Sequence, residues 1–254
     1  MPEYQKIIYS VEQTIARITL NRPEKRNALN DEVVTELKDA MRLSASDESV
    51  RVVLITGAGK DFCSGADLAA LQKVSEASVM ENVNNARRMG ELFIDMRRHP
   101  RPIIAAIRGR ALAGGCGLAT ACDIILAEES AQFGYPEVNI GFIPAMVMAI
   151  LRRSVSEKRA FELITRGEII GARAALDAGM INRVFADDEF ESRTEEYVQE
   201  MAKKSASAVS LAKNLLYHMD SMAFDAAIEA GVQLNAITRM TPDCKRGVER
   251  FLKK

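Results

Sequence analysis

A glycine-rich run between two apolar segments constrains this chain more than any other feature. Residues 103–107 read Ile-Ile-Ala-Ala-Ile, which is typical of a buried strand, and residues 118–122 present one apolar helical face. The twelve residues 108–119 include four glycines. A strand that runs through glycines into a helix leaves backbone N–H groups unpaired beside the positive end of the helix dipole. The run therefore predicts a site for a negative oxygen, although close packing alone also explains glycines at a helix start.

A second loop of the same type favours the anion site over simple packing. The loop at residues 64–67, Ser-Gly-Ala-Asp, follows an apolar strand at 52–56 and a glycine-bearing turn, and leads toward another predicted helix. Two such loops on neighbouring strands of one sheet could each direct one N–H group at a shared point. A pair of convergent N–H donors forms an oxyanion hole, in which each donor contributes about 10²–10³ in rate.

Nucleotide-cofactor motifs are absent from the sequence. It contains no G-x-G-x-x-G with an acidic residue at the spacing that a ribose contact requires, and no G-x-x-x-x-G-K-[ST]. A nicotinamide-dependent oxidoreductase is therefore a distant alternative. His99 and His218 have no partners at metal-ligand spacing, so no metal site is expected.

Net charge and hydropathy limit the classes of partner that this chain is expected to have. The 34 basic and 35 acidic residues give a net charge of −1, which favours neither nucleic acid nor an anionic membrane surface as partner. No apolar run approaches the roughly 20 residues of a membrane span. The N-terminus lacks the pattern of a signal peptide, and the four cysteines form no C-x-x-C pair. We therefore expect a cytoplasmic protein with buried free thiols.

Strands alternate with helices over the first three quarters of the chain, and only helices follow. The predicted strands and helices of the first part are listed here: strands at 7–10, 14–20, 52–56, 103–107, 123–127, near 131–134 and at 181–184; helices at 31–43, 79–98, 145–153, 157–165 and 172–178. Helices alone are predicted at 190–202, 206–217, 222–238 and 242–254. This order predicts an α/β core with an α-helical C-terminal part.

Four segments together resemble the crotonase superfamily, the enoyl-CoA hydratase/isomerase family. They are Asn21–Leu29, Asp61–Leu68, Gly109–Asp123 and Gln132–Glu137, and they appear in the family's order and at its spacing. The resemblance extends over essentially the whole chain. The resemblance implies a ββα spiral core over residues 1–190 that binds acyl-CoA and carries out catalysis. It also implies an α-helical region over residues 191–254 that forms homotrimers, often paired as homohexamers, and completes the CoA site.

The resemblance assigns three catalytic positions. It implies that the backbone N–H groups of Ser64 and Gly114 hold the oxygen of an acyl-CoA thioester, so that an enolate forms at low cost. Glu137 matches the family's catalytic glutamate. Its loop has few other charges, so desolvation is expected to raise its pKa. Taken without the motif, Glu137 would read as a solvent-exposed loop carboxylate.

The resemblance also assigns the residues that contact coenzyme A, and it implies no cofactor beyond the CoA moiety of the substrate. Two basic residues are expected near the nucleotide phosphates, four loop residues beside the pantetheine and adenine, and two C-terminal residues against the CoA of a neighbouring subunit. In that order they are Lys25 and Arg26; Gly65, Ala66, Asp67 and Leu68; Phe251 and Lys254. Without the family, Lys25 and Arg26 would read as a solvated turn.

Two departures from the family pattern bear on the reaction. Hydratases of the family usually carry a second glutamate where this chain has Gly117, and bulky residues at 145–148 replace a glycine-rich turn. One carboxylate suffices for a 1,3 proton shift, so Gly117 with Glu137 favours double-bond isomerisation. The bulky residues at 145–148 predict a drier, reshaped acyl pocket. A hydratase with a substitute for the second glutamate, and an acyl-CoA-binding protein without catalysis, stay open. Simple helix packing explains Met146 and Met148 equally well.

Overall fold

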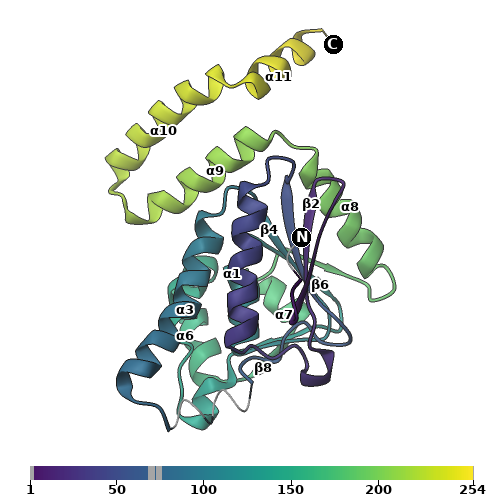
Figure 1. Ribbon diagram of the computed structural model, residues 1–254. Helices are drawn as coiled ribbons and strands as arrows, with labels where there is room; N and C mark the ends of the chain where they lie inside the picture. Colours follow the sequence, from purple (N-terminus) through teal and green to yellow (C-terminus); the bar gives the residue numbers. More distant parts are fainter. Residues whose placement is uncertain (1–2, 68–71, 73–75, 254) are drawn as a thin grey trace.

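The larger of two sheets carries the core of the molecule (Figure 1). The computed structural model describes residues 3–67, 72 and 76–253. The strands of this sheet, in spatial order, are β1 (Ile7–Glu12), β2 (Ile15–Leu20), β3 (Val52–Gly57), β4 (Ile103–Ile107), β6 (Ile124–Glu128) and β9 (Arg183–Phe185). The first pair is antiparallel and the other pairs are parallel. The α/β class predicted from the alternation is confirmed.

The larger sheet is covered on both faces, which explains its continuously apolar strands. Along β3, Val53 and Ile55 belong to one buried cluster, while Val52 and Leu54 belong to another. The first cluster lies under α1 (Asp31–Ser46), α3 (Val79–Arg98), α4 (Gly114–Ala121), α5 (Ala145–Ser154), α6 (Glu157–Arg166) and α7 (Ala172–Asp177). The second lies under α8 (Phe190–Ala202).

A smaller sheet extends from the C-terminal ends of these strands toward the predicted site. It consists of β5 (Arg110–Leu112), β7 (Gln132–Gly134) and β8 (Ile169–Gly171), with β5 and β7 parallel and β7 and β8 antiparallel. The sequence predicted β7 but neither β5 nor β8. Three-residue strands carry no measurable periodicity, and only their pairing defines them.

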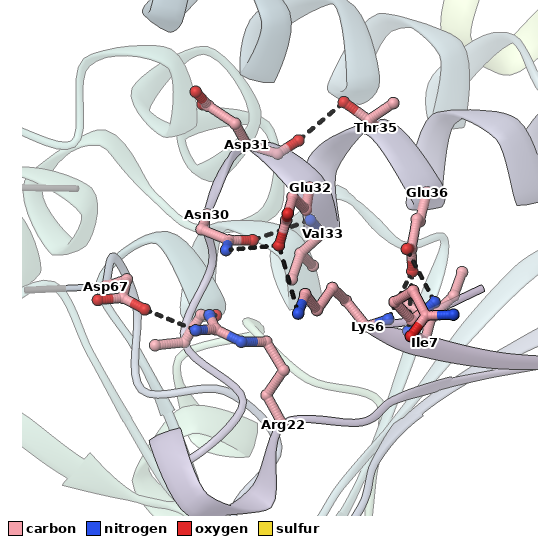
Figure 2. Close-up of polar contacts among 12 residues, drawn as sticks. Lys6, Ile7, Arg22, Asn30, Asp31, Glu32, Val33, Thr35, Glu36 and Asp67 are labelled. Carbon is pink, nitrogen blue, oxygen red and sulfur yellow. Dashed lines mark hydrogen bonds and ion pairs between the residues drawn. The ribbon is translucent and has the colours of Figure 1, made fainter. Parts of the chain in front are cut away.

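Local capping signals mark several helix boundaries. The Asn30 side chain accepts from the Val33 N–H at 2.9 Å and begins α1 where the sequence predicted it. Glu36 of α1 accepts from the backbone N–H groups at the start of β1, which fastens the helix to the sheet (Figure 2). Ser78 and Glu81 form a capping box at the start of α3.

The α-helices that follow α8 are placed differently: the first lies across the end of the core, and the others project from it. They are α9 (Ala206–His218), α10 (Phe224–Met240) and α11 (Pro242–Leu252), and α10 and α11 project from the body of the molecule (Figure 1). α8 packs on the larger sheet, although it belongs to the helical stretch after residue 190. The division into a core of residues 1–190 and a helical region of residues 191–254 stays a prediction. Over the described residues, no helix is long and apolar enough to cross a membrane.

Candidate active site

The two predicted loops lie against one another, because the strands that precede them, β3 and β4, are parallel neighbours. The Cys63 N–H donates to the Arg110 carbonyl at 2.9 Å, and the Leu112 N–H donates to the Cys63 carbonyl at 3.0 Å. Gly65 has φ +101°, and a Cβ atom at this residue would lie only 2.8 Å from the Ala113 Cβ. The close approach of the loops therefore depends on glycine at position 65.

Ser64 does not offer a free N–H group, which corrects the first predicted donor. Its N–H donates to the Arg26 carbonyl at 3.0 Å. Leu29 bonds to the residues on both sides of Ala66. Its N–H donates to the Gly65 carbonyl at 2.7 Å, and its carbonyl accepts from the Asp67 N–H at 2.9 Å. In a parallel bridge of this kind, the peptide groups of the central residue, Ala66, point the other way. The Ala66 N–H has no acceptor among the described residues, and it replaces Ser64 as the first candidate donor.

Gly114 supplies the second candidate donor, as the sequence predicted. It is the first residue of α4, so its N–H has no intrahelical acceptor. Ala113 precedes it with φ +48°, a strained conformation for a residue with a side chain, and the Ala113 N–H donates to the Gly134 carbonyl at 2.9 Å. Such strain is of order 1–3 kcal/mol and is common at functional sites.

Glu137 lies beside this helix start. Leu112 pairs with Gly134 in the smaller sheet, and Glu137 follows three residues later in the 3₁₀ helix Pro136–Ile140. Its side chain is half-buried, and its Oε2 atom has no hydrogen-bond partner among the described residues. Burial raises the pKa of this carboxyl. Burial also raises the pKa of the Cys116 thiol on α4, and the Glu137 charge adds a smaller contribution. The reading of Glu137 as a solvent-exposed carboxylate is therefore wrong.

The space beside Gly117 is filled by apolar side chains. A Cβ atom at this glycine would lie 2.5 Å from the Val147 Cγ2 atom and 3.5 Å from the Phe93 Cζ atom. Both side chains are buried, at 5% exposure each. Val147 belongs to α5, where the sequence departs from the family's glycine-rich turn. Position 117 thus has no room for a side chain unless Val147 moves.

The two methionines on this helix differ from Val147. Met146 is 36% exposed, and its Sδ atom lies 3.5 Å from where a Gly90 Cβ would stand. Phe142 and Ile143, in the loop before α5, are more than half exposed. Phe142, Ile143 and Met146 therefore expose apolar side chains near Glu137 in the sequence, whereas Val147 packs into the core.

The predicted CoA contacts fall into three groups. Lys25 and Arg26 are exposed on the turn after β2, and Arg26 borders a groove with Lys60 and Arg110. Gly65, Ala66 and Asp67 form the loop described above. Phe251 is 79% exposed on α11, at the end of the molecule opposite β8, so this chain does not bring it to its own site (Figure 1). Leu68 and Lys254 lie outside the described residues.

Asp67 has a partner that the sequence did not predict. Its Oδ2 atom lies 2.7 Å from the Arg22 Nη2 atom, and both side chains are largely buried (Figure 2). Arg22 stands in the same motif as Lys25 and Arg26, which was the only signal for it in the sequence. Over the described ranges, no group of three or more His, Cys, Asp or Glu side chains could hold a metal ion.

Known proteins of one family are similar to this chain over nearly its whole length. The family model for enoyl-CoA hydratase/isomerase matches residues 10–254. The 2,3-dehydroadipyl-CoA hydratase of Escherichia coli is 34% identical over 98% of this chain and 96% of its own. The crotonyl-CoA hydratase of Syntrophomonas wolfei is 32% identical over 99% of this chain and 96% of its own. The crystal structure of an enoyl-CoA hydratase from Mycobacterium smegmatis superposes with a TM-score of 0.93 at 31% identity, covering 98% and 96% of the two chains. This chain therefore belongs to the enoyl-CoA hydratase/isomerase family and is a crotonase-type acyl-CoA enzyme.

Proposed function

We propose that this enzyme moves the double bond of an enoyl-CoA thioester by a 1,3 proton shift, as in the conversion of a 3-enoyl-CoA to a 2-enoyl-CoA. The observation that carries the proposal is the apolar filling of position 117 by Val147. Because α4 carries no Asp or Glu, Glu137 has no second carboxylate on that helix with which to divide the proton transfers. A proton shift between two carbons requires only one acid/base.

In this mechanism Glu137 takes a proton from carbon 2 of the 3-enoyl thioester, and the electron pair of that C–H bond passes into a dienolate. The Ala66 and Gly114 N–H groups hold the thioester oxygen while it carries the charge. Protonated Glu137 then returns the proton to carbon 4, and the double bond lies between carbons 2 and 3. The raised pKa of Glu137 suits both steps, because the group must accept and release a proton near neutral pH.

Hydration of a 2-enoyl-CoA is the second candidate function. The names of the relatives favour it, since the Escherichia coli and Syntrophomonas wolfei proteins are both named as hydratases. In this chain a hydratase would need Glu137 to activate water, with a group other than residue 117 to supply the proton at carbon 2. The Val147 and Phe93 side chains make the region beside residue 117 dry, which weighs against a second water-positioning group there.

A paired assay tests the proposal. The enzyme is given a 3-enoyl-CoA and crotonyl-CoA separately, and the wild type is compared with Glu137→Gln. We expect isomerisation to exceed hydration and the variant to lose it. Rapid crotonyl-CoA hydration that survives in Glu137→Gln would overturn the role of Glu137. Tight acyl-CoA binding with no exchange of the α-proton in deuterated water would favour the binding protein without catalysis.

The CoA site and the assembly form part of the same proposal. Lys25 and Arg26 contact the nucleotide phosphates, and no cofactor beyond the substrate's CoA takes part. The enzyme works as a homotrimer or homohexamer in which Phe251 reaches the CoA of a neighbouring subunit. Support comes from α10, a 17-residue helix without a buried residue, which exposes Phe224, Ile228, Val232 and Ile237.

A further inference from the structure

A nearly buried ion pair holds the end of the loop at residues 64–67, which carries the candidate donor Ala66. The Arg22 Nη2 atom lies 2.7 Å from the Asp67 Oδ2 atom, with side-chain exposures of 12% and 14%. The Arg22 Nη1 atom donates to the Ala28 carbonyl at 2.6 Å. Figure 2 shows Arg22 reaching from the segment after β2 toward Asp67. Asp67 is the residue next to Ala66, whose N–H is the first candidate donor.

The turn that carries Arg22 is itself firmly anchored. Asn27 is 1% exposed, and its Oδ1 atom accepts from the Arg22 N–H at 2.9 Å. Its Nδ2 group donates to the carbonyls of Ala58 at 2.9 Å and Asp61 at 2.7 Å. These bonds connect the turn to the segment after β3, so the Arg22 guanidinium projects from a fixed base.

The same turn holds the loop on both sides of Ala66. Leu29 forms backbone hydrogen bonds with Gly65, which precedes Ala66, and with Asp67, which follows it. The ion pair adds a side-chain contact at Asp67. Gly65, at φ +101°, is a flexible residue immediately before the donor. The ion pair at Asp67 therefore adds a side-chain constraint to the backbone bonds that orient the Ala66 peptide.

The ion pair is poorly explained by stability. Removing two charges from water costs several kcal/mol per ion, and apolar replacements of buried pairs are often neutral or stabilising. An oxyanion donor, by contrast, must stay within a few tenths of an ångström of its working position. We infer that Arg22, through its ion pair with Asp67, is a positioning residue that fixes the Ala66 N–H in the oxyanion hole. This inference rests on the proposed function of the site.

Variants of the pair test the inference through polarisation of the bound thioester. A conjugated aryl-enoyl-CoA absorbs at longer wavelength when its carbonyl oxygen is held by N–H donors, so the red shift on binding reports the oxyanion hole directly. In Arg22→Met we expect kcat to fall about 10- to 100-fold, less than the 10²- to 10³-fold loss of a whole donor, because the Ala66 N–H is displaced but still present. The red shift should decrease, while the Kd for free CoA stays near the wild-type value. Arg22→Lys should restore part of kcat.

The double variant Arg22→Met with Asp67→Asn separates positioning from folding. It removes both charges of the ion pair together, so its Tm should return toward the wild-type value while kcat and the red shift stay low. Arg42→Met is the matched control, because Arg42 is 75% exposed on α1 and pairs only with Asp39 among the described residues; it should leave both readouts unchanged.

Two results would contradict the inference. One is a wild-type red shift and kcat in Arg22→Met; the other is full recovery of kcat together with Tm in the double variant. Failure of the proposed function looks different: the wild-type enzyme itself would show no red shift and no turnover with any enoyl-CoA.

Discussion

Glu137 is half-buried, and its Oε2 atom has no hydrogen-bond partner among the described residues. Burial raises its pKa above 4.5, and the reactive form is the carboxylate. The acid limb of kcat/KM should therefore lie above pH 4.5, with activity falling as pH decreases through the raised pKa. In Glu137→Gln we expect a 10²- to 10⁴-fold loss of isomerisation.

Stability should change in the opposite direction. Because the folded state holds the Glu137 proton more tightly than the unfolded state does, folding weakens as pH rises through the window above 4.5. At pH 7, Glu137→Gln should unfold at a temperature equal to or above that of the wild type. A clear decrease in Tm would show that the carboxylate has a stabilising partner in the folded protein.

The side chains that positions 117 and 147 can hold depend on each other, because they share the same space. The 2.5 Å distance between a Cβ at residue 117 and Val147 Cγ2 means that Gly117→Glu alone must displace a packed side chain. Overpacking of this kind costs about 1–3 kcal/mol. We expect Gly117→Glu to lower Tm without gaining hydratase activity, and Gly117→Glu with Val147→Gly to hydrate crotonyl-CoA faster than either single variant. Equal hydration by all three variants would show that residue 117 does not face the substrate.

At the scale of elements, one buried lysine fastens the C-terminal helices to the sheet. The Lys213 Nζ group on α9 donates to Met96 O at 3.0 Å, to Arg101 O at 3.1 Å and to Asp123 Oδ2 at 2.7 Å. Asp123 also accepts from Tyr217 at 2.5 Å, which adds a second tie from the same helix. Figure 1 shows α9 lying across the end of the core, where these bonds form.

Removal of this lysine should weaken the whole domain. Lys213→Met leaves Asp123 buried without its cation, which typically costs about 3–5 kcal/mol of unfolding free energy. Chemical denaturation measures the loss. Lys204→Met, at an exposed position just before α9, is the control and should change stability by less than about 0.5 kcal/mol. Equal effects from the two variants would show that the buried ion pair contributes little.

At the scale of the whole molecule, His99 makes stability depend on pH. Burial, followed by the charge of Lys213, lowers its pKa from 6.5 to about 4. The Nδ1 atom accepts from the Arg101 N–H, and the Nε2 group lies 3.1 Å from the Ser44 hydroxyl, so a neutral ring satisfies both.

The stabilising contribution of neutral His99 is complete above pH 6.5 and is lost as pH falls from 6.5 to about 4. The expected loss is on the order of 3 kcal/mol. Urea unfolding at pH 7 and pH 4.5 checks this, with His99→Gln showing a smaller difference between the two values. A pH dependence that is identical in the variant would assign it to other groups.

Assembly is the second property of the whole molecule. The apolar residues exposed along α10 lie on a helix that projects from the core, and water-exposed faces of this kind usually mark an interface. Sedimentation should give three or six times the 28.0 kDa mass of the chain. Replacing Ile228 and Val232 with aspartate should give monomers that lose CoA affinity. A wild-type monomer with full CoA affinity would contradict the predicted assembly.

The sequence by itself determined the order of the elements and several of their ends. Periodicity predicted α3 and β4 with the bounds that the structure has, and Asn30 predicted the start of α1. These signals act between residues close in the chain, so they are legible without the fold. The resemblance to the family, and not local pattern, pointed to Glu137, which the structure places beside the start of α4 at Gly114.

Long-range contacts settle which backbone N–H group can bind a substrate oxygen and which side chains surround it. Ser64 and Ala66 are indistinguishable as donors in the sequence. Pairing with residues about 40 positions earlier gives the Ser64 N–H an acceptor, whereas the Ala66 N–H has none within the described part of the chain. The buried partner of Asp67 and the filling of the space at Gly117 likewise come from distant segments. The physical reason is the same in each case. A backbone donor, a charge or a void is defined by what lies across from it, and long-range packing determines that.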